Sequence, residues 1–264
     1  MDEEHKEINL DECTGKSRDL TEICSSLDIP SRKIDEGALD SYRKNRPSEE
    51  TLVKYMAEID ALLKSNVVVM GGFCANPSVL GFRKMRRTSN DLDCVTDGDG
   101  IQSLKETFDG RLFRTENHGD VFLDYNGVPV GFDVRETHSW EVPQSLAYSS
   151  RRIESAFGGF NVISPEFLIA LKARRSILKG RYFGKDALDT ANLLLAPLYR
   201  DNLKMIDFER TGDLMRRHAS DSLDVALSYL SFLSGYENHL RVSERSTFNG
   251  VMISLKSAVR NAYL

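Results

Sequence analysis

Apolar residues recur at helical spacing directly after a polar N-terminal stretch. Leu52, Tyr55 and Met56 begin this repeat, and Ser48 precedes it with a hydroxyl that can cap a helix. The pattern predicts a helix from Ser48 to about residue 65. The preceding stretch lacks a sustained apolar period, so it is expected to form loosely attached helices or to be partly disordered.

Short apolar runs rich in β-branched residues follow the predicted helix and are typical of buried strands. The first run stops at Gly71 and Gly72, which predicts a tight turn. Asn126 and Gly127 separate two later runs and favour a hairpin turn. The sequence predicts strands at residues 67–70, 92–96, 111–116, 120–125, 128–135 and 160–163.

The pattern changes from strands to helices at Ser164, which can cap a helix, and Pro165, which suits a first helical position. The predicted fold class is α+β, with a mixed β-sheet core flanked by helices and followed by a helical C-terminal region. The expected domains are a polar acidic segment (1–47), a mixed-sheet core (48–157) and a mainly helical domain (158–264). Helices in the last of these are expected at residues 165–179, 185–197, 207–217, 221–233 and 245–262.

Composition is that of an ordinary globular protein, with 264 residues of which 41% are apolar. No apolar run approaches the roughly 18 residues of a membrane span, so no membrane association is expected. The net charge of −5 argues against a protein that coats nucleic acid, although local basic clusters occur, for example at Arg151 and Arg152. Solvated surface is the simpler interpretation of each cluster. The four cysteines lack CxxC spacing, which favours a reducing, cytoplasmic compartment.

Three acidic residues in the predicted strands stand out as candidate metal ligands. Strand alternation places Asp91 and Asp93 on one face, where two adjacent carboxylates repel unless a cation lies between them. Asp133 interrupts an apolar strand, and a charged residue there needs a partner. A hard divalent ion with oxygen ligands fits such a set. The competing interpretation of an Asp-x-Asp sequence is a turn or a helix-capping pair.

The segment from Gly71 and Gly72 to Asp93 resembles the signature of the DNA polymerase β-like nucleotidyltransferase superfamily. In particular it resembles the AbiEii-like group of toxin nucleotidyltransferases, in which a Gly-Gly or Gly-Ser turn precedes an Arg-x-Ser/Thr-x-Asp-x-Asp sequence. Here Arg87, Ser89, Asp91 and Asp93 match that sequence. One departure is that Phe73 and Cys74 follow the glycines, where many relatives have small or hydroxyl residues.

A second block of the same resemblance starts at Ser164-Pro165-Glu166. It continues with Lys172, with Arg175 or Arg181, and with Lys185-Asp186 followed by Asp189. Overall the resemblance covers roughly residues 66 to 196.

The resemblance also implies roles for individual residues. Asp91, Asp93 and Asp133 would be catalytic and would hold two Mg²⁺ ions, while the nucleotide would contact Gly71, Gly72, Arg87 and Ser89. Lys172 would contact the triphosphate as a compact charge. Asp186 would orient it, with Asp189 as the alternative for that task. Without the resemblance, Lys172 reads equally as a solvated helix residue and the two acids as helix N-terminal residues.

The implied function is transfer of a nucleoside monophosphate from a nucleoside triphosphate to a macromolecular acceptor, with tRNA or another RNA as a candidate. A toxin role implies a cognate antitoxin as protein partner. Two alternatives stay open at this point. One is a nucleotidyltransferase acting on a small molecule such as an antibiotic, and the other is a non-catalytic module of the same fold that binds a partner.

Overall fold

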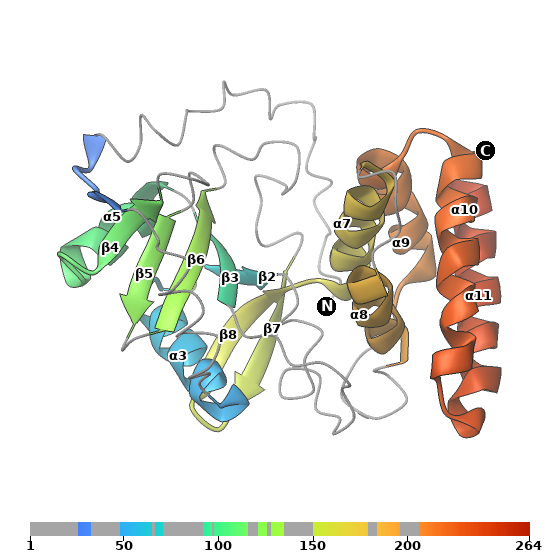
Figure 1. The fold of residues 1–264 in the computed structure, drawn as a ribbon, viewed down its shortest axis with the longest axis horizontal. Coiled ribbons are helices and arrows are strands. Elements are labelled where there is room, and N and C mark those ends of the chain that lie inside the picture. The colour runs from blue at the N-terminus through green and yellow to red at the C-terminus, as the bar shows by residue number, and fades with distance from the viewer. Residues whose placement is uncertain are drawn as a thin grey trace, which may run out of the picture.

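The chain forms a sheet half and a helical half, which lie side by side in the computed structural model (Figure 1). Layers of helices stand beside the sheet half, with α7, α8 and α9 nearer to it and α10 and α11 farther away. The structure describes residues 26–32, 48–64, 67–70, 92–96, 98–115, 121–125, 128–134, 150–178, 184–195 and 206–264.

Within these residues, eight strands form one mixed sheet in the order β1-β4-β5-β6-β3-β2-β8-β7. The pairs β1–β4, β3–β6 and β2–β8 are parallel, and the other neighbouring pairs are antiparallel. The strands are β1 (Ser31–Arg32), β2 (Val68–Met70), β3 (Leu92–Thr96), β4 (Leu112–Thr115), β5 (Val121–Tyr125), β6 (Val128–Val134), β7 (Ser150–Ser155) and β8 (Gly158–Ile163).

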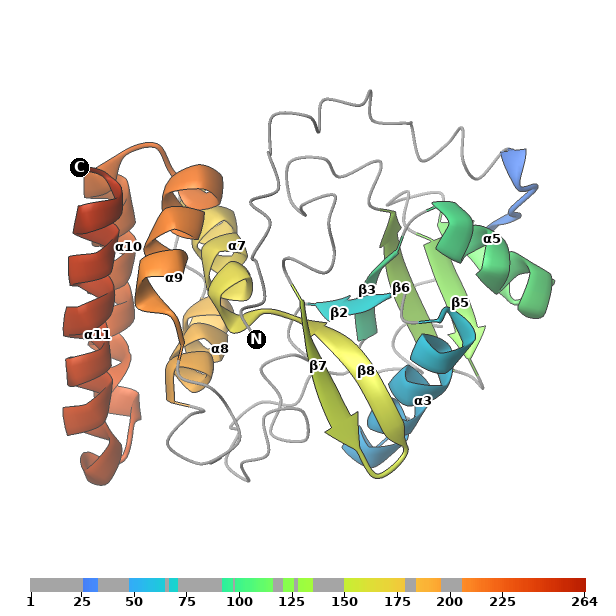
Figure 2. The ribbon, with the colours of Figure 1, turned by 180° about the vertical axis from the view of Figure 1, so that it is seen from behind.

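Helix α3 (Glu49–Leu62) lies against the sheet beside β8 (Figure 2). Ser48 caps it as predicted, since its Oγ accepts a hydrogen bond from the backbone N–H of Thr51 at 3.1 Å. Met56 is fully buried, and Cys94 of β3 approaches it with a sulfur-to-sulfur distance of 3.7 Å. Burial of this apolar stripe holds α3 on one face of the sheet.

The helical half begins directly after β8, with Ser164 capping α7 through a 3.2 Å bond from the backbone N–H of Phe167 to its Oγ. Helices α9 and α11 pack closely, because a β-carbon on Gly212 would lie only 2.8 Å from the carbonyl oxygen of Ala258. The elements are α7 (Pro165–Leu178), α8 (Gly184–Leu195), α9 (Phe208–Leu214), the π-helix η4 (Met215–Ala219), α10 (Leu223–Ser234), the 3₁₀-helix η5 (Gly235–His239) and α11 (Val242–Ala262).

The α+β prediction is confirmed, and so are the predicted strands and C-terminal helices to within a few residues. Helix α5 (Gly98–Thr107) was not predicted, nor was strand β7, which pairs with β8. Strand β1 was not predicted either, and it adds residues from the polar N-terminal stretch to the edge of the sheet. No helix in the described ranges is long and apolar enough to cross a membrane.

Candidate functional site

The backbone register of β3 and β6 relates two of the three predicted metal-binding residues. These strands run parallel, with Asp93 paired to Gly131 and Val95 paired to Asp133. Since paired positions share a face and alternate positions return to it, positions 93 and 133 lie on the same face of the sheet. They are offset by two residues on adjacent strands, which corresponds to roughly 8 Å between their Cα atoms.

The neighbouring strand β2 brings a further predicted segment to this part of the sheet. Met70, the last residue of β2, is the register partner of Asp93. Gly71 and Gly72 follow it directly in the sequence. These two glycines, with Arg87, Ser89 and Asp91, lie outside the described residues, so their predicted roles stay predictions.

The opposite face of the same strands belongs to the core. Cys94 of β3 and Phe132 of β6 are register partners, and both are buried. Cys94 packs against Met56 of α3. Helix α3 therefore covers the face that alternates with the one carrying positions 93 and 133.

A second group of charged side chains lies between α7 and α8, where the sequence predicted Lys172 and Asp186. The Nζ of Lys172 is 3.5 Å from Oδ1 of Asp186 and 2.8 Å from Oδ2 of Asp189. Arg175 also binds Asp186 through two nitrogens, with Nε 2.7 Å from Oδ2. The structure therefore brings both candidate acids to Lys172 rather than one of them.

These four side chains, Lys172, Arg175, Asp186 and Asp189, form a cluster that is mostly enclosed. The Lys172 side chain is 4% exposed, whereas Arg175 is 47% exposed. Burial opposes ionisation of Asp186, but the hydrogen bonds and charges of Arg175 and Lys172 outweigh it and lower the pKa of its carboxyl group. With two cations and two anions, the cluster is neutral.

Two residues that the sequence did not predict as site residues lie next to this cluster. Thr190 donates its hydroxyl hydrogen bond to the carbonyl oxygen of Asp186, and its Oγ1 is 3.2 Å from the hydroxyl of Tyr229. Burial raises the pKa of Tyr229, which is fully enclosed, so this hydroxyl stays protonated. Tyr229 is therefore a residue of the buried core.

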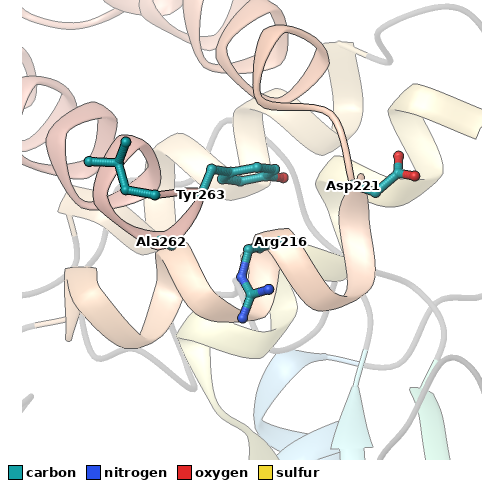
Figure 3. Close-up of a pocket in the computed structure, with 5 residues that line it drawn as sticks. Arg216, Asp221, Ala262 and Tyr263 are labelled. Carbon is teal, nitrogen blue, oxygen red and sulfur yellow. The ribbon is translucent and has the colours of Figure 1, made fainter.

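The metal-ligand pattern of the described side chains adds no further site for the predicted chemistry. Among these side chains, no group of three or more His, Cys, Asp or Glu residues could hold a metal ion. A shallow pocket of about 470 Å³ lies at the end of α11, between Arg216 of η4 and Tyr263 (Figure 3). None of its lining residues is a predicted site residue.

Comparisons with known proteins find a similarity to a solved structure. No family model matches the chain, and no curated protein matches it. The chain is similar to the crystal structure of an antigenic nucleotidyltransferase-like protein from Paracoccidioides brasiliensis. That similarity has a TM-score of 0.47 and 17% sequence identity, and covers 76% of this chain and 92% of that chain.

Proposed function

We propose that this protein is a magnesium-dependent nucleotidyltransferase that transfers a nucleoside monophosphate from a nucleoside triphosphate to a macromolecular acceptor. The main support is the register that puts positions 93 and 133 on one face of adjacent strands. The proposal adds Asp91, which the Asp-x-Asp spacing of the sequence pairs with Asp93. Three neighbouring carboxylates would supply the oxygen ligands that divalent ions such as Mg²⁺ prefer.

In this proposal the acidic residues divide the work. Asp91 and Asp93 would hold the ions, and Asp133 would complete the second site and accept the proton of the attacking hydroxyl. The acceptor oxygen then forms a bond to the α-phosphorus while the bond to pyrophosphate breaks. When bound, Mg²⁺ supplies charge neutralisation of the phosphate oxygens.

The remaining predicted residues would bind the nucleotide. Gly71 and Gly72 would let backbone N–H groups approach the phosphates, with Arg87 and Ser89 beside them. Lys172 would contact the triphosphate. Because its ammonium is now enclosed by Asp186 and Asp189, that contact requires its release from Asp189, while Arg175 continues to neutralise Asp186.

The acceptor proposed is RNA, with tRNA as one candidate, and the biological role proposed is that of a toxin with a cognate antitoxin. Both rest on the resemblance of the Arg87-to-Asp93 segment to the AbiEii-like group. The basic stretch at 83–87 would lie on the acceptor side, because a phosphate backbone attracts clustered arginine and lysine.

The test is incubation of the purified protein with Mg²⁺, each labelled nucleoside triphosphate in turn, and total RNA. We expect label in RNA from the unmodified protein and none from the Asp93→Asn variant. The matched control is Asp99→Asn, which makes the same change at an exposed acid of α5. It should label RNA at the wild-type rate.

Two outcomes would reject the proposal. Undiminished labelling by Asp93→Asn, with its fold verified by circular dichroism, would remove the metal assignment. Absence of Mg²⁺-dependent triphosphate binding in calorimetry of the unmodified protein would leave a non-catalytic binding module. Label found in small molecules of a lysate rather than in RNA would identify the other class of acceptor.

A further inference from the structure

Two neighbouring arginines of β7 bind buried acids on different helices. Arg151 donates to Oε1 of Glu166 on α7, whereas Nη1 of Arg152 lies 3.1 Å from Oδ2 of Asp60 on α3. Strand alternation explains the divergence, since consecutive side chains leave a strand on opposite faces. The first pair joins the sheet half to the helical half, and the second pair stays within the sheet half.

Glu166 connects three elements through one carboxylate. Its Oε1 accepts the bond from Arg151 of β7 and a second bond, 3.1 Å long, from the backbone N–H of Asp207, which caps α9. Glu166 is fully buried, and its Oε2 has no hydrogen-bond partner in the part of the chain that is described. A buried carboxylate that lost Arg151 would lack a charged partner, so the pair strongly favours one arrangement of β7, α7 and α9.

This arrangement controls where the Lys172 cluster lies. Glu166 is in the first turn of α7, and Lys172 follows six residues later, about 9 Å along the helix axis. On the sheet side, β7 pairs with β8, β8 with β2, and β2 with the strand that carries Asp93. A change in the tilt of α7 against β7 would therefore move Lys172 relative to the positions of Asp93 and Asp133.

We infer that Arg151 and Glu166 are positioning residues that fix α7 against the sheet. They thereby hold the Lys172 cluster at the distance that nucleotidyl transfer needs from the acidic face, which is the face of β3 and β6 with positions 93 and 133. This inference rests on the proposed function. A displacement of about 1 Å in an active site can cost a hundredfold in rate, so an ion pair that sets the angle of a helix has a large effect on turnover.

The chain contains a closely matched control for this pair. Asp60 is also a buried acid bound by an arginine of β7, and it accepts a second bond, 3.3 Å long, from a backbone N–H, that of Asn161. Asp60→Asn and Glu166→Gln thus remove the same charge from the same kind of contact. They differ in whether the contact joins the two halves.

The kinetic test compares these variants at fixed Mg²⁺ with saturating RNA. We expect Glu166→Gln and Arg151→Gln to lower kcat about tenfold or more and to raise KM for the triphosphate, because Lys172, the proposed triphosphate contact, is displaced from its position. Arg151→Lys, which keeps the charge, should recover part of kcat. Asp60→Asn should leave kcat unchanged. Equal kcat in all four variants would overturn the inference.

A structural test separates failure of this inference from failure of the proposed function. Spin labels are attached to cysteines introduced at the exposed positions Ala61 of α3 and Ser257 of α11, after replacement of the four native cysteines, and their separation is measured by pulsed electron resonance. The distance distribution should shift or broaden in the Glu166→Gln variant. If that variant does not fold, Arg151→Gln takes its place, because Arg151 is only half buried. It should not change with Asp60→Asn. An unchanged distribution in folded Arg151→Gln would overturn the inference whether or not the protein transfers nucleotides.

Discussion

The ammonium of Lys172 on α7 lies 2.8 Å from a carboxylate oxygen of Asp189 on α8, and both side chains are buried. Buried charges are retained only when each has a partner, because desolvation of a lone charge is costly. Here Asp186 and Arg175 complete the balance of charge. The cluster therefore couples two helices and depends on all four members.

Removal of Lys172 should destabilise the protein more than removal of Arg175. Lys172→Met leaves Asp189 buried without the cation that now binds it, and we expect a loss of about 3 kcal/mol in the free energy of unfolding. Arg175→Gln should cost less, since its side chain is half exposed and Lys172 still faces Asp186. Urea unfolding followed by circular dichroism measures both. A larger loss for Arg175→Gln would contradict the assigned partners.

Two glycines of the helical half should respond to alanine in opposite directions. At Gly212 the added methyl group would lie 2.8 Å from the carbonyl oxygen of Ala258, so α9 and α11 must separate, and we expect a loss of about 1–3 kcal/mol. At Gly250 of α11 nothing lies within 4 Å. Alanine there should stabilise the protein by about 0.5–1 kcal/mol through helix propensity. Thermal unfolding of the two variants side by side provides the measurement.

Stability should fall with pH in the range where His218 titrates. Burial, followed by the charges of Arg217 and Arg174, lowers the pKa of His218 from its ordinary value of 6.5. The unfolded chain then binds a proton at higher pH than the folded chain, so folding stability declines as pH falls through about 6.5 toward the lower pKa.

The His218→Gln variant isolates this contribution. Its free energy of unfolding should change less between pH 7 and pH 5 than that of the unmodified protein, as measured by urea titration at each pH. Asp186 does not interfere, since its pKa lies below 3.8 and its stabilising charge is lost only in stronger acid. Parallel pH profiles of the two proteins would show that protonation of His218 is not linked to unfolding.

Sequence reasoning succeeded where local signals and burial agree. The β-branched runs gave β2, β3 and β6, and capping residues such as Ser48 and Ser164 gave the helix starts. The sequence offered Asp186 and Asp189 as alternatives beside Lys172, and the structure shows both of them there. Their spacing of three residues puts them on one face of α8. The choice between them depended on the approach of α7, a tertiary contact that helix periodicity does not encode.

Sequence reasoning failed where tertiary packing overrides local composition. The segment around Asp99 reads as a glycine-containing loop, yet it forms α5 because Ile101 and Leu104 are fully buried. Gly100 belongs there because a β-carbon would collide with the side chain of Thr96. The polar segment around Arg151 reads as solvated surface, yet it forms β7, since its partners, β8 and two buried acids, come from elsewhere in the chain.

Magnesium should stabilise the folded protein if it binds at the acidic face of β3 and β6. A ligand that binds only the folded state raises the stability of the protein, by about 2.7 kcal/mol when its concentration is a hundred times Kd. Mg²⁺ with a nucleoside triphosphate should therefore raise the unfolding temperature, and EDTA should reverse the effect.

In the Asp133→Asn variant this increase in unfolding temperature should disappear. Without metal the variant should be at least as stable as the unmodified protein, because it lacks one of the mutually repelling carboxylates that the proposal assigns to the metal site. The neighbouring acid Asp124 of β5 is exposed, and Asp124→Asn should keep the full response. An unaltered magnesium response in Asp133→Asn would show that this position binds no ion, whatever its register with β3.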